Sequence, residues 1–155
     1  MIILINDNKH KEGVTIFSIF NSMGFMLGKV TEQMIEKCNK ELATCQIDAK
    51  EYGILTVIIS MAESTQQQVG EVLRIDRTSM VKKVDHLESL GYILRIKNAT
   101  DRRTYNLKLT DAGEQILNEF WPIMLNCERN VLSPLTDEEV LNLKIVFTKL
   151  IKAWK

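Results

Sequence analysis

Residues 77–110 read RTSMVKKVDHLESLGYILRIKNATDRRTYNLKLT, and this stretch decides the fold class of the chain. In its first part Met80, Val84 and Leu87 recur at helical spacing, which places them on one apolar face. Gly91 follows, and glycine commonly ends a helix because it readily adopts the left-handed conformation after the last turn. The first part of the stretch is therefore predicted to be a helix.

Strand-forming residues follow this glycine. Residues 92–97 and 104–109 are rich in β-branched, aromatic and other apolar side chains, and the second run alternates apolar with polar residues. The segment between them, residues 98–103, is polar and has the composition of a turn. A β-hairpin with a polar, basic tip is predicted.

Two shorter helices are predicted upstream, each from a pair of capping residues. Asp48 with Glu51 opens one, and Thr65 with Gln68 opens the next, which a tight turn at residues 74–76 separates from the helix already described. Three short helices followed by a hairpin are the order of a winged helix-turn-helix. We expect that lobe over residues 48–110.

Longer helices are predicted on both sides of this lobe. The run from Val14 to about Leu42 carries an apolar stripe and further apolar residues beside it, so it needs more than one packing partner. Thr110 or Asp111 caps a helix toward Leu132, and Thr136 with Glu139 caps a last one. We therefore expect one domain over residues 1–155 that uses residues 14–45 and 111–155 as dimerisation helices. The stripe of the first helix is Ile16, Phe20, Met23, Leu27, Val30 and Met34.

The charge of the chain is unevenly distributed. The whole sequence of 155 residues holds 20 basic and 20 acidic residues, a formal net charge of zero. Between Arg74 and Lys108, nine basic residues stand against four acidic ones, a surplus of five. A cationic middle segment indicates one module that faces an anion, carried on a neutral to acidic scaffold.

The second helix of the helix-turn-helix, from about Arg77 to Leu90, is predicted to enter the major groove of DNA. Its outward residues are expected to meet bases and phosphates, whereas Asp85 and Glu88 are expected to point away from the DNA. At the hairpin tip, Arg102 and Arg103 are predicted to reach a minor groove, with Asp101 bracing an arginine. The contact residues predicted on the helix are Arg77, Thr78, Ser79, Lys82, Lys83 and His86.

Four segments resemble the MarR family of bacterial transcription regulators. They are TQQQVGEVL at residues 65–73, DHLESLGYILR at 85–95, DRR at 101–103 and LKLTDAG at 107–113. The long flanking helices resemble that family's dimerisation region. The resemblance implies a homodimer on a pseudo-palindromic operator in double-stranded DNA, with the helix from Arg77 to Leu90 in the major groove.

Further roles follow only from this resemblance. It implies that Arg103 inserts into the minor groove while Asp101 orients it, and that Thr65, Gln66 and Gln67 lie near phosphates. It also implies a repressor that a small apolar or phenolic effector releases, although repression and activation both stay open. Some relatives sense oxidants through a cysteine in a context like residues 16–21, where this chain has none.

Composition narrows the remaining possibilities. The apolar run at residues 1–5 is too short for a signal peptide or membrane span, so we expect a cytoplasmic protein. Cys38, Cys45 and Cys127 are odd in number and lack metal-ligand spacing, so no disulfide framework, metal site or cofactor is expected. Whether any of them has a redox role stays open.

Two other classes of function compete with DNA reading. A protein-interaction adaptor that keeps the winged-helix shape without binding DNA would suit the zero net charge, and salt-dependent duplex binding would separate the two. An enzyme is disfavoured, because the sequence offers no activated nucleophile, paired-carboxylate site, glycine-rich phosphate loop or metal cluster. The sequence therefore favours a DNA-binding regulator.

Overall fold

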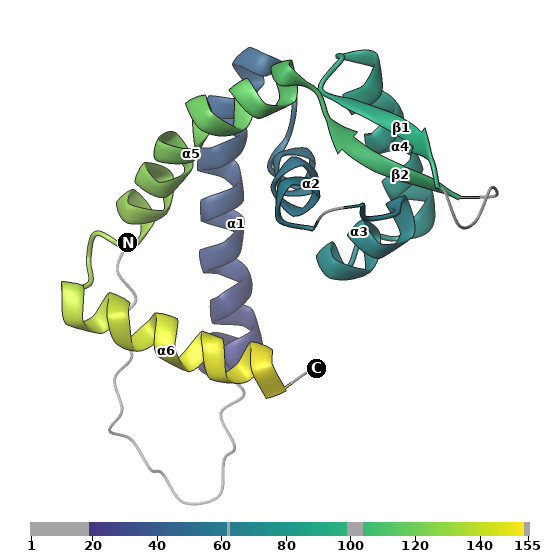
Figure 1. The fold of residues 1–155 in the computed structure, drawn as a ribbon. Coiled ribbons are helices and arrows are strands. Elements are labelled where there is room, and N and C mark those ends of the chain that lie inside the picture. Colours follow the sequence, from purple (N-terminus) through teal and green to yellow (C-terminus); the bar gives the residue numbers. More distant parts are fainter. Residues whose placement is uncertain (1–18, 62, 99–103, 154–155) are drawn as a thin grey trace, which may run out of the picture.

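The computed structural model describes residues 19–61, 63–98 and 104–153, which form a mainly helical chain with one small hairpin (Figure 1). Strands β1 and β2 pair antiparallel. The predicted fold class, mainly α with a β-hairpin wing, is confirmed. In chain order the elements are η1 (Ile19–Asn21), α1 (Met23–Leu42), η2 (Ala43–Cys45), α2 (Ala49–Ser60), α3 (Gln66–Leu73), α4 (Arg77–Ser89), β1 (Ile93–Lys97), β2 (Tyr105–Leu109), α5 (Asp111–Val131) and α6 (Asp137–Ala153).

Two parts of the chain can be followed in Figure 1. Helices α2, α3 and α4 gather with the hairpin, and we call this group the winged lobe. Helices α1 and α5 pack side by side next to it, and we call this pair the arm. Helix α6 follows α5 at the end of the arm that lies away from the hairpin. None of the helices among the described residues combines the length and apolar character needed to cross a bilayer.

Side-chain caps start most of the helices where the sequence predicts them. Asp48 and Glu51 form a complete capping box on α2, and Thr65 and Gln68 form another on α3. In each box the first side chain accepts from a backbone N–H that has no partner within the helix. Thr110 caps α5 by accepting from the Gly113 N–H at 3.1 Å.

The first long helix begins later than predicted. We expected it to run from Val14, whereas α1 begins at Met23 behind the short turn η1. The Ser22 hydroxyl accepts from the Phe25 N–H at 3.4 Å, so a side chain satisfies a free donor at this point and the helix starts here. Residues 14–18 of the predicted helix lie outside the described residues.

The core of the winged lobe forms where α4 and the hairpin meet α2. Ile54 and Leu55 of α2 are fully buried, and so are Val84 and Leu87 of α4 and Ile93 of β1. Met80 of α4 is also buried, which confirms the inward face predicted from helical spacing. This burial fixes one face of α4 on the lobe and leaves the opposite face in solvent.

The hairpin is attached to the rest of the lobe through β2. Its register runs from Ile93 opposite Leu109 to Lys97 opposite Tyr105, which confirms the two predicted strands. The Leu107 N–H donates to the Ser64 carbonyl at 2.9 Å, just before α3. Residues 99–103 of the tip lie outside the described residues, so the predicted positions of Asp101, Arg102 and Arg103 lie there too.

A close approach joins the hairpin to α5. The Thr110 N–H donates to the Tyr92 carbonyl at 3.1 Å, and Gly113 lies against the same carbonyl. A Cβ on Gly113 would stand 2.1 Å from the Tyr92 oxygen, a separation that backbone atoms cannot tolerate. Glycine is therefore required where the arm leaves the winged lobe.

Replacing Gly113 with Ala is expected to lower the free energy of unfolding by about 1–3 kcal/mol, because the new methyl group overpacks a backbone contact. Gly53→Ala is the matched control, since a Cβ there would meet Leu73 at an ordinary 3.6 Å within helix α2. The control should be neutral or stabilising by about 0.5–1 kcal/mol. Urea denaturation measures the free energy of unfolding of both variants, and equal values for Gly113→Ala and Gly53→Ala would contradict the prediction.

Candidate nucleic-acid interface

A three-residue turn sets α4 directly after α3. Arg74 takes the left-handed conformation with φ of 51°, and its N–H bonds back to the end of α3. The Ile75 N–H donates to the Gly70 carbonyl at 2.9 Å, and Asp76 then caps α4 by accepting from the Ser79 N–H at 2.9 Å. The backbone N–H of Ser79 holds the Asp76 pKa below its ordinary value, so this cap is charged at neutral pH. The turn therefore fixes where α4 starts.

The outward face of α4 holds some of the predicted contact residues. Arg77, Thr78 and Lys82 are exposed, and Ser79 is partly buried. They lie opposite the buried face of Met80, Val84 and Leu87, as the helical spacing predicted. On the solvent-exposed side of α4 these side chains present hydroxyl donors and positively charged groups that a ligand can bind.

An open groove of about 820 Å³ separates α3 and the first turns of α4 from the start of β2. It brings Arg77 of α4 together with three predicted residues at the start of α3. Its lining includes Thr65, Gln66, Gln67 and Arg77, together with Gly70, Glu71, Arg74, Ile75, Asp76, Met80, Val81, Thr104 and Tyr105. Gln67 also donates to the Glu71 carboxylate at 2.9 Å. The polar start of α3 and the start of α4 therefore face one concave surface.

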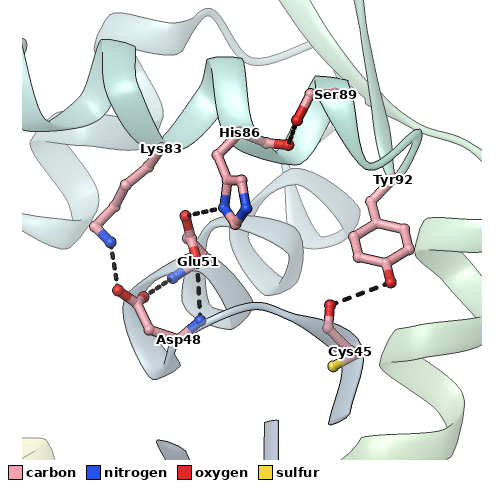
Figure 2. Close-up of polar contacts among 7 residues, drawn as sticks. All are labelled: Cys45, Asp48, Glu51, Lys83, His86, Ser89 and Tyr92. Carbon is pink, nitrogen blue, oxygen red and sulfur yellow. Dashed lines mark hydrogen bonds and ion pairs between the residues drawn. The ribbon is translucent and has the colours of Figure 1, made fainter. Parts of the chain in front are cut away.

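Lys83 does not lie on the outward face, so its predicted orientation is wrong. Its ammonium group binds the Asp48 carboxylate of α2's cap at 2.5 Å, and only 18% of its side chain is exposed (Figure 2). Burial raises the pKa of Asp48, but hydrogen bonds from Lys83 and from the Glu51 N–H outweigh it and leave that pKa below its ordinary value. Lys83 thus joins α4 to α2.

His86 lies at the edge of the outward face and also contacts α2. Its Nδ1 stands 2.9 Å from the buried Glu51 carboxylate, and 42% of its side chain is exposed (Figure 2). The other oxygen of Glu51 accepts from the Asp48 N–H at 2.9 Å, the second half of the capping box. A helical-wheel projection of α4 alone could not reveal these partners, because they come from a cap 35 residues earlier.

The opposite flank of α4 contacts the wing through a residue that sequence analysis counted only as a charge. The Arg95 guanidinium of β1 binds Asp85 and Glu88 together, and the Arg95 N–H donates to Glu88 at 3.3 Å. Burial lowers the pKa of Arg95, but these two carboxylates outweigh it and raise the pKa above its ordinary value. The sequence did contain a signal for this contact, namely two acidic residues one helical turn apart that precede an arginine in the next strand.

Comparison with known proteins agrees with this geometry. The MarR family model matches residues 46–104, which hold α2, α3, α4 and β1. The HTH-type transcriptional regulator PecS of Dickeya dadantii is 26% identical over 129 residues, 81% of this chain and 78% of PecS. The segment that holds the three short helices therefore matches the MarR family. The relatives matched in this way are named as transcription regulators, so this chain is a transcription regulator rather than an enzyme.

Solved MarR-family structures share the fold. A cysteine-to-serine variant of MarR from E. coli, crystallised with operator DNA, has a TM-score of 0.74 at 25% identity and covers 82% of this chain and 91% of that one. PcaV of Streptomyces coelicolor, crystallised with its natural ligand, has a TM-score of 0.75 at 17% identity. It covers 92% of this chain and 100% of that one, and at this identity it supports the fold alone.

Residues 19–61, 63–98 and 104–153 offer no evident site for metal or thiol chemistry. Among the residues that the structure describes, no group of three His, Cys, Asp or Glu side chains could hold a metal ion. Burial, and next the neighbouring Cys127, raises the pKa of the Cys38 thiol to about 11, and burial also raises that of Cys45. Cys38 and Cys45 are therefore protonated at neutral pH, a state in which a thiol is a poor nucleophile.

Replacing Lys83 with Met is expected to lower the free energy of unfolding at pH 7 by about 1 kcal/mol, because Asp48 loses a partly buried charged partner. The folded-state pKa of Asp48 is lowered, so this stabilisation exists above the ordinary pKa of 3.8 and disappears as the pH falls through the folded-state value. Lys82→Met, on the exposed face, is the control. Chemical denaturation at pH 7 and pH 3 measures both, and an equal loss for the two variants would refute the assignment.

Proposed function

We propose that this regulator is a homodimeric, sequence-specific repressor that binds a pseudo-palindromic operator in double-stranded DNA. The observation that carries the proposal is the exposed face of α4, with Thr78 and Lys82, beside the open groove at the start of α3. Hydroxyl groups and cations on a helix of this kind can meet base edges and phosphates in a major groove. The likeness to MarR solved with operator DNA supports the same mode of docking.

Each part of the interface has a separate task in this proposal. Thr78, Ser79 and Lys82 read bases or bind phosphates, while Thr65, Gln66, Gln67 and Arg77 around the groove position the lobe on the DNA backbone. For the wing we propose that Arg102 and Arg103 reach the minor groove and that Asp101 orients Arg103. Lys83 and His86, which bind α2, serve to hold the reading helix rather than to contact bases.

The apolar surface of the arm and of α6 supports a dimer. Within the described chain α6 has no buried residue, and Leu141 and Leu150 are 58% and 44% exposed. Met23 and Leu27 near the start of α1 are exposed as well. A soluble chain rarely leaves such faces in water, and a second copy would cover them while presenting two reading helices to a two-fold symmetric site.

The signal that releases the operator is proposed from the family alone. We infer a small apolar or phenolic effector that binds between the dimerisation helices and the winged lobe. PcaV, which shares the fold, has been solved with its natural ligand. Because the target is chromosomal DNA, we place this regulator in the cytoplasm.

The proposed function is tested by selecting operator fragments from genomic DNA with the purified protein. On the best fragment, Lys82→Ala should weaken binding and reduce the salt-dependence slope by about one per protomer if this lysine contacts phosphate. Lys83→Ala should leave the slope unchanged, because this lysine binds Asp48 instead. Failure to select any duplex would favour the adaptor alternative, and equal slopes for both variants would reject the assigned face.

The dimer is tested on α6 with two adjacent residues. Leu150→Glu should produce monomers or aggregates, because it puts a carboxylate into the apolar face that the second copy covers. Lys149→Glu, next to it and on an already exposed polar position, should stay dimeric. Sedimentation equilibrium at micromolar concentration distinguishes the species, and a stable wild-type monomer would exclude this assembly.

A further inference from the structure

The wing is joined to the reading helix by one side chain that two carboxylates bind. Arg95 is the middle residue of β1, and its side chain reaches Asp85 and Glu88 on the flank of α4. Its two terminal nitrogens have different partners, since Nη1 binds Glu88 and Nη2 binds Asp85. Glu88 also accepts from the Arg95 backbone N–H at 3.3 Å. Side chain and strand backbone are thus bound to the same turn of α4.

Arg95 is poorly placed to bind DNA itself. Only 22% of its side chain is exposed, and both carboxylates already occupy its planar donor group. A single ion pair would let the strand swivel about one contact, whereas two carboxylates one turn apart on α4 fix the guanidinium plane in direction as well as distance. The contact therefore controls an angle, namely that between the hairpin and α4.

We propose that Arg95 is a positioning residue for operator recognition, which holds the wing at the one angle to α4 that lets both elements reach the same duplex. The proposal rests on the proposed function and adds to it a residue that does not touch DNA. Arg95 lies in the middle of β1, so a change of angle at this residue is magnified along the paired strands. The outward residues of α4 are fixed separately by the buried face of that helix.

Charge alone predicts the opposite result for one variant, which makes the proposal testable. Replacing Asp85 and Glu88 with Asn and Gln removes two negative charges from the helix proposed to bind DNA, so electrostatics without positioning predicts tighter binding. If the carboxylates act by holding Arg95, the same double substitution weakens binding. Arg95→Gln weakens it as well, and the triple variant is no worse than Arg95→Gln alone.

The experiment measures operator affinity and hydroxyl-radical footprints for Arg95→Gln, Arg95→Lys, Asp85→Asn/Glu88→Gln and the triple variant. Arg95→Gln and the double variant should each lose roughly tenfold in affinity. Protection of the minor groove at the flanks should fade while protection of the central major groove persists. Arg95→Lys should recover part of the loss, because an ammonium group can still bind one carboxylate. Lys97→Gln removes the same charge two residues along the strand, so it should keep the wild-type footprint pattern.

Several results would overturn the positioning role. Tighter binding by the carboxylate variant, additive losses in the triple variant, or a lower melting temperature with an unchanged footprint would each do so. A wild-type protein that selects no DNA would instead overturn the proposed function. Wild-type selection combined with unaltered footprints in Arg95→Gln would overturn only the role of Arg95.

Discussion

A helix that reads DNA must expose one face and still be held rigidly, and the burial of Met80, Val84 and Leu87 is the contact through which α4 meets both demands. These side chains pack on α2 and the hairpin, so the direction of α4 follows from the core of the winged lobe. Rotation about its own axis is limited by the flanks, where Lys83 and His86 bind α2 and two carboxylates bind β1. The face of α4 that none of these contacts covers is the one exposed to solvent.

The winged lobe is joined to the arm by polar contacts as well as by packing. The Tyr52 hydroxyl donates to the Leu117 carbonyl of α5 at 3.2 Å. The Tyr92 hydroxyl donates to the Cys45 carbonyl at 3.3 Å, as Figure 2 shows. The first bond links α2 to α5, and the second links the residue before β1 to η2, which follows α1. Burial raises the pKa of both phenols. The two hydroxyls thus remain donors at physiological pH.

Local rules predicted the fold well because they act within a few residues. The caps at Asp48, Thr65 and Thr110 and the inward face of α4 required only the next turn of chain. The family model matches residues 46–104, which hold most of the segment where the resemblance was densest. The start of α1 was predicted too early, because an apolar stripe does not reveal that the Ser22 hydroxyl caps the helix just before Met23.

The candidate site was predicted less completely, since its partners come from distant segments. Periodicity placed Lys83 outward, but the capping carboxylate of α2 lies within reach and binds it. Arg95 was counted only as a charge, because nothing in its immediate sequence says that a strand will bring it to α4. Long-range ion pairs of this kind need the folded arrangement before they can be identified.

The shared carboxylate at Asp48 restricts how this position can change during evolution. As a helix cap, aspartate is interchangeable with serine or threonine, whose hydroxyls accept the same N–H. Here the second oxygen binds Lys83, so a hydroxyl would keep α2 and leave a largely buried ammonium group without its partner. Among descendants of this chain, substitution of residue 48 should therefore occur together with substitution of residue 83, although the two residues are 35 positions apart in the sequence.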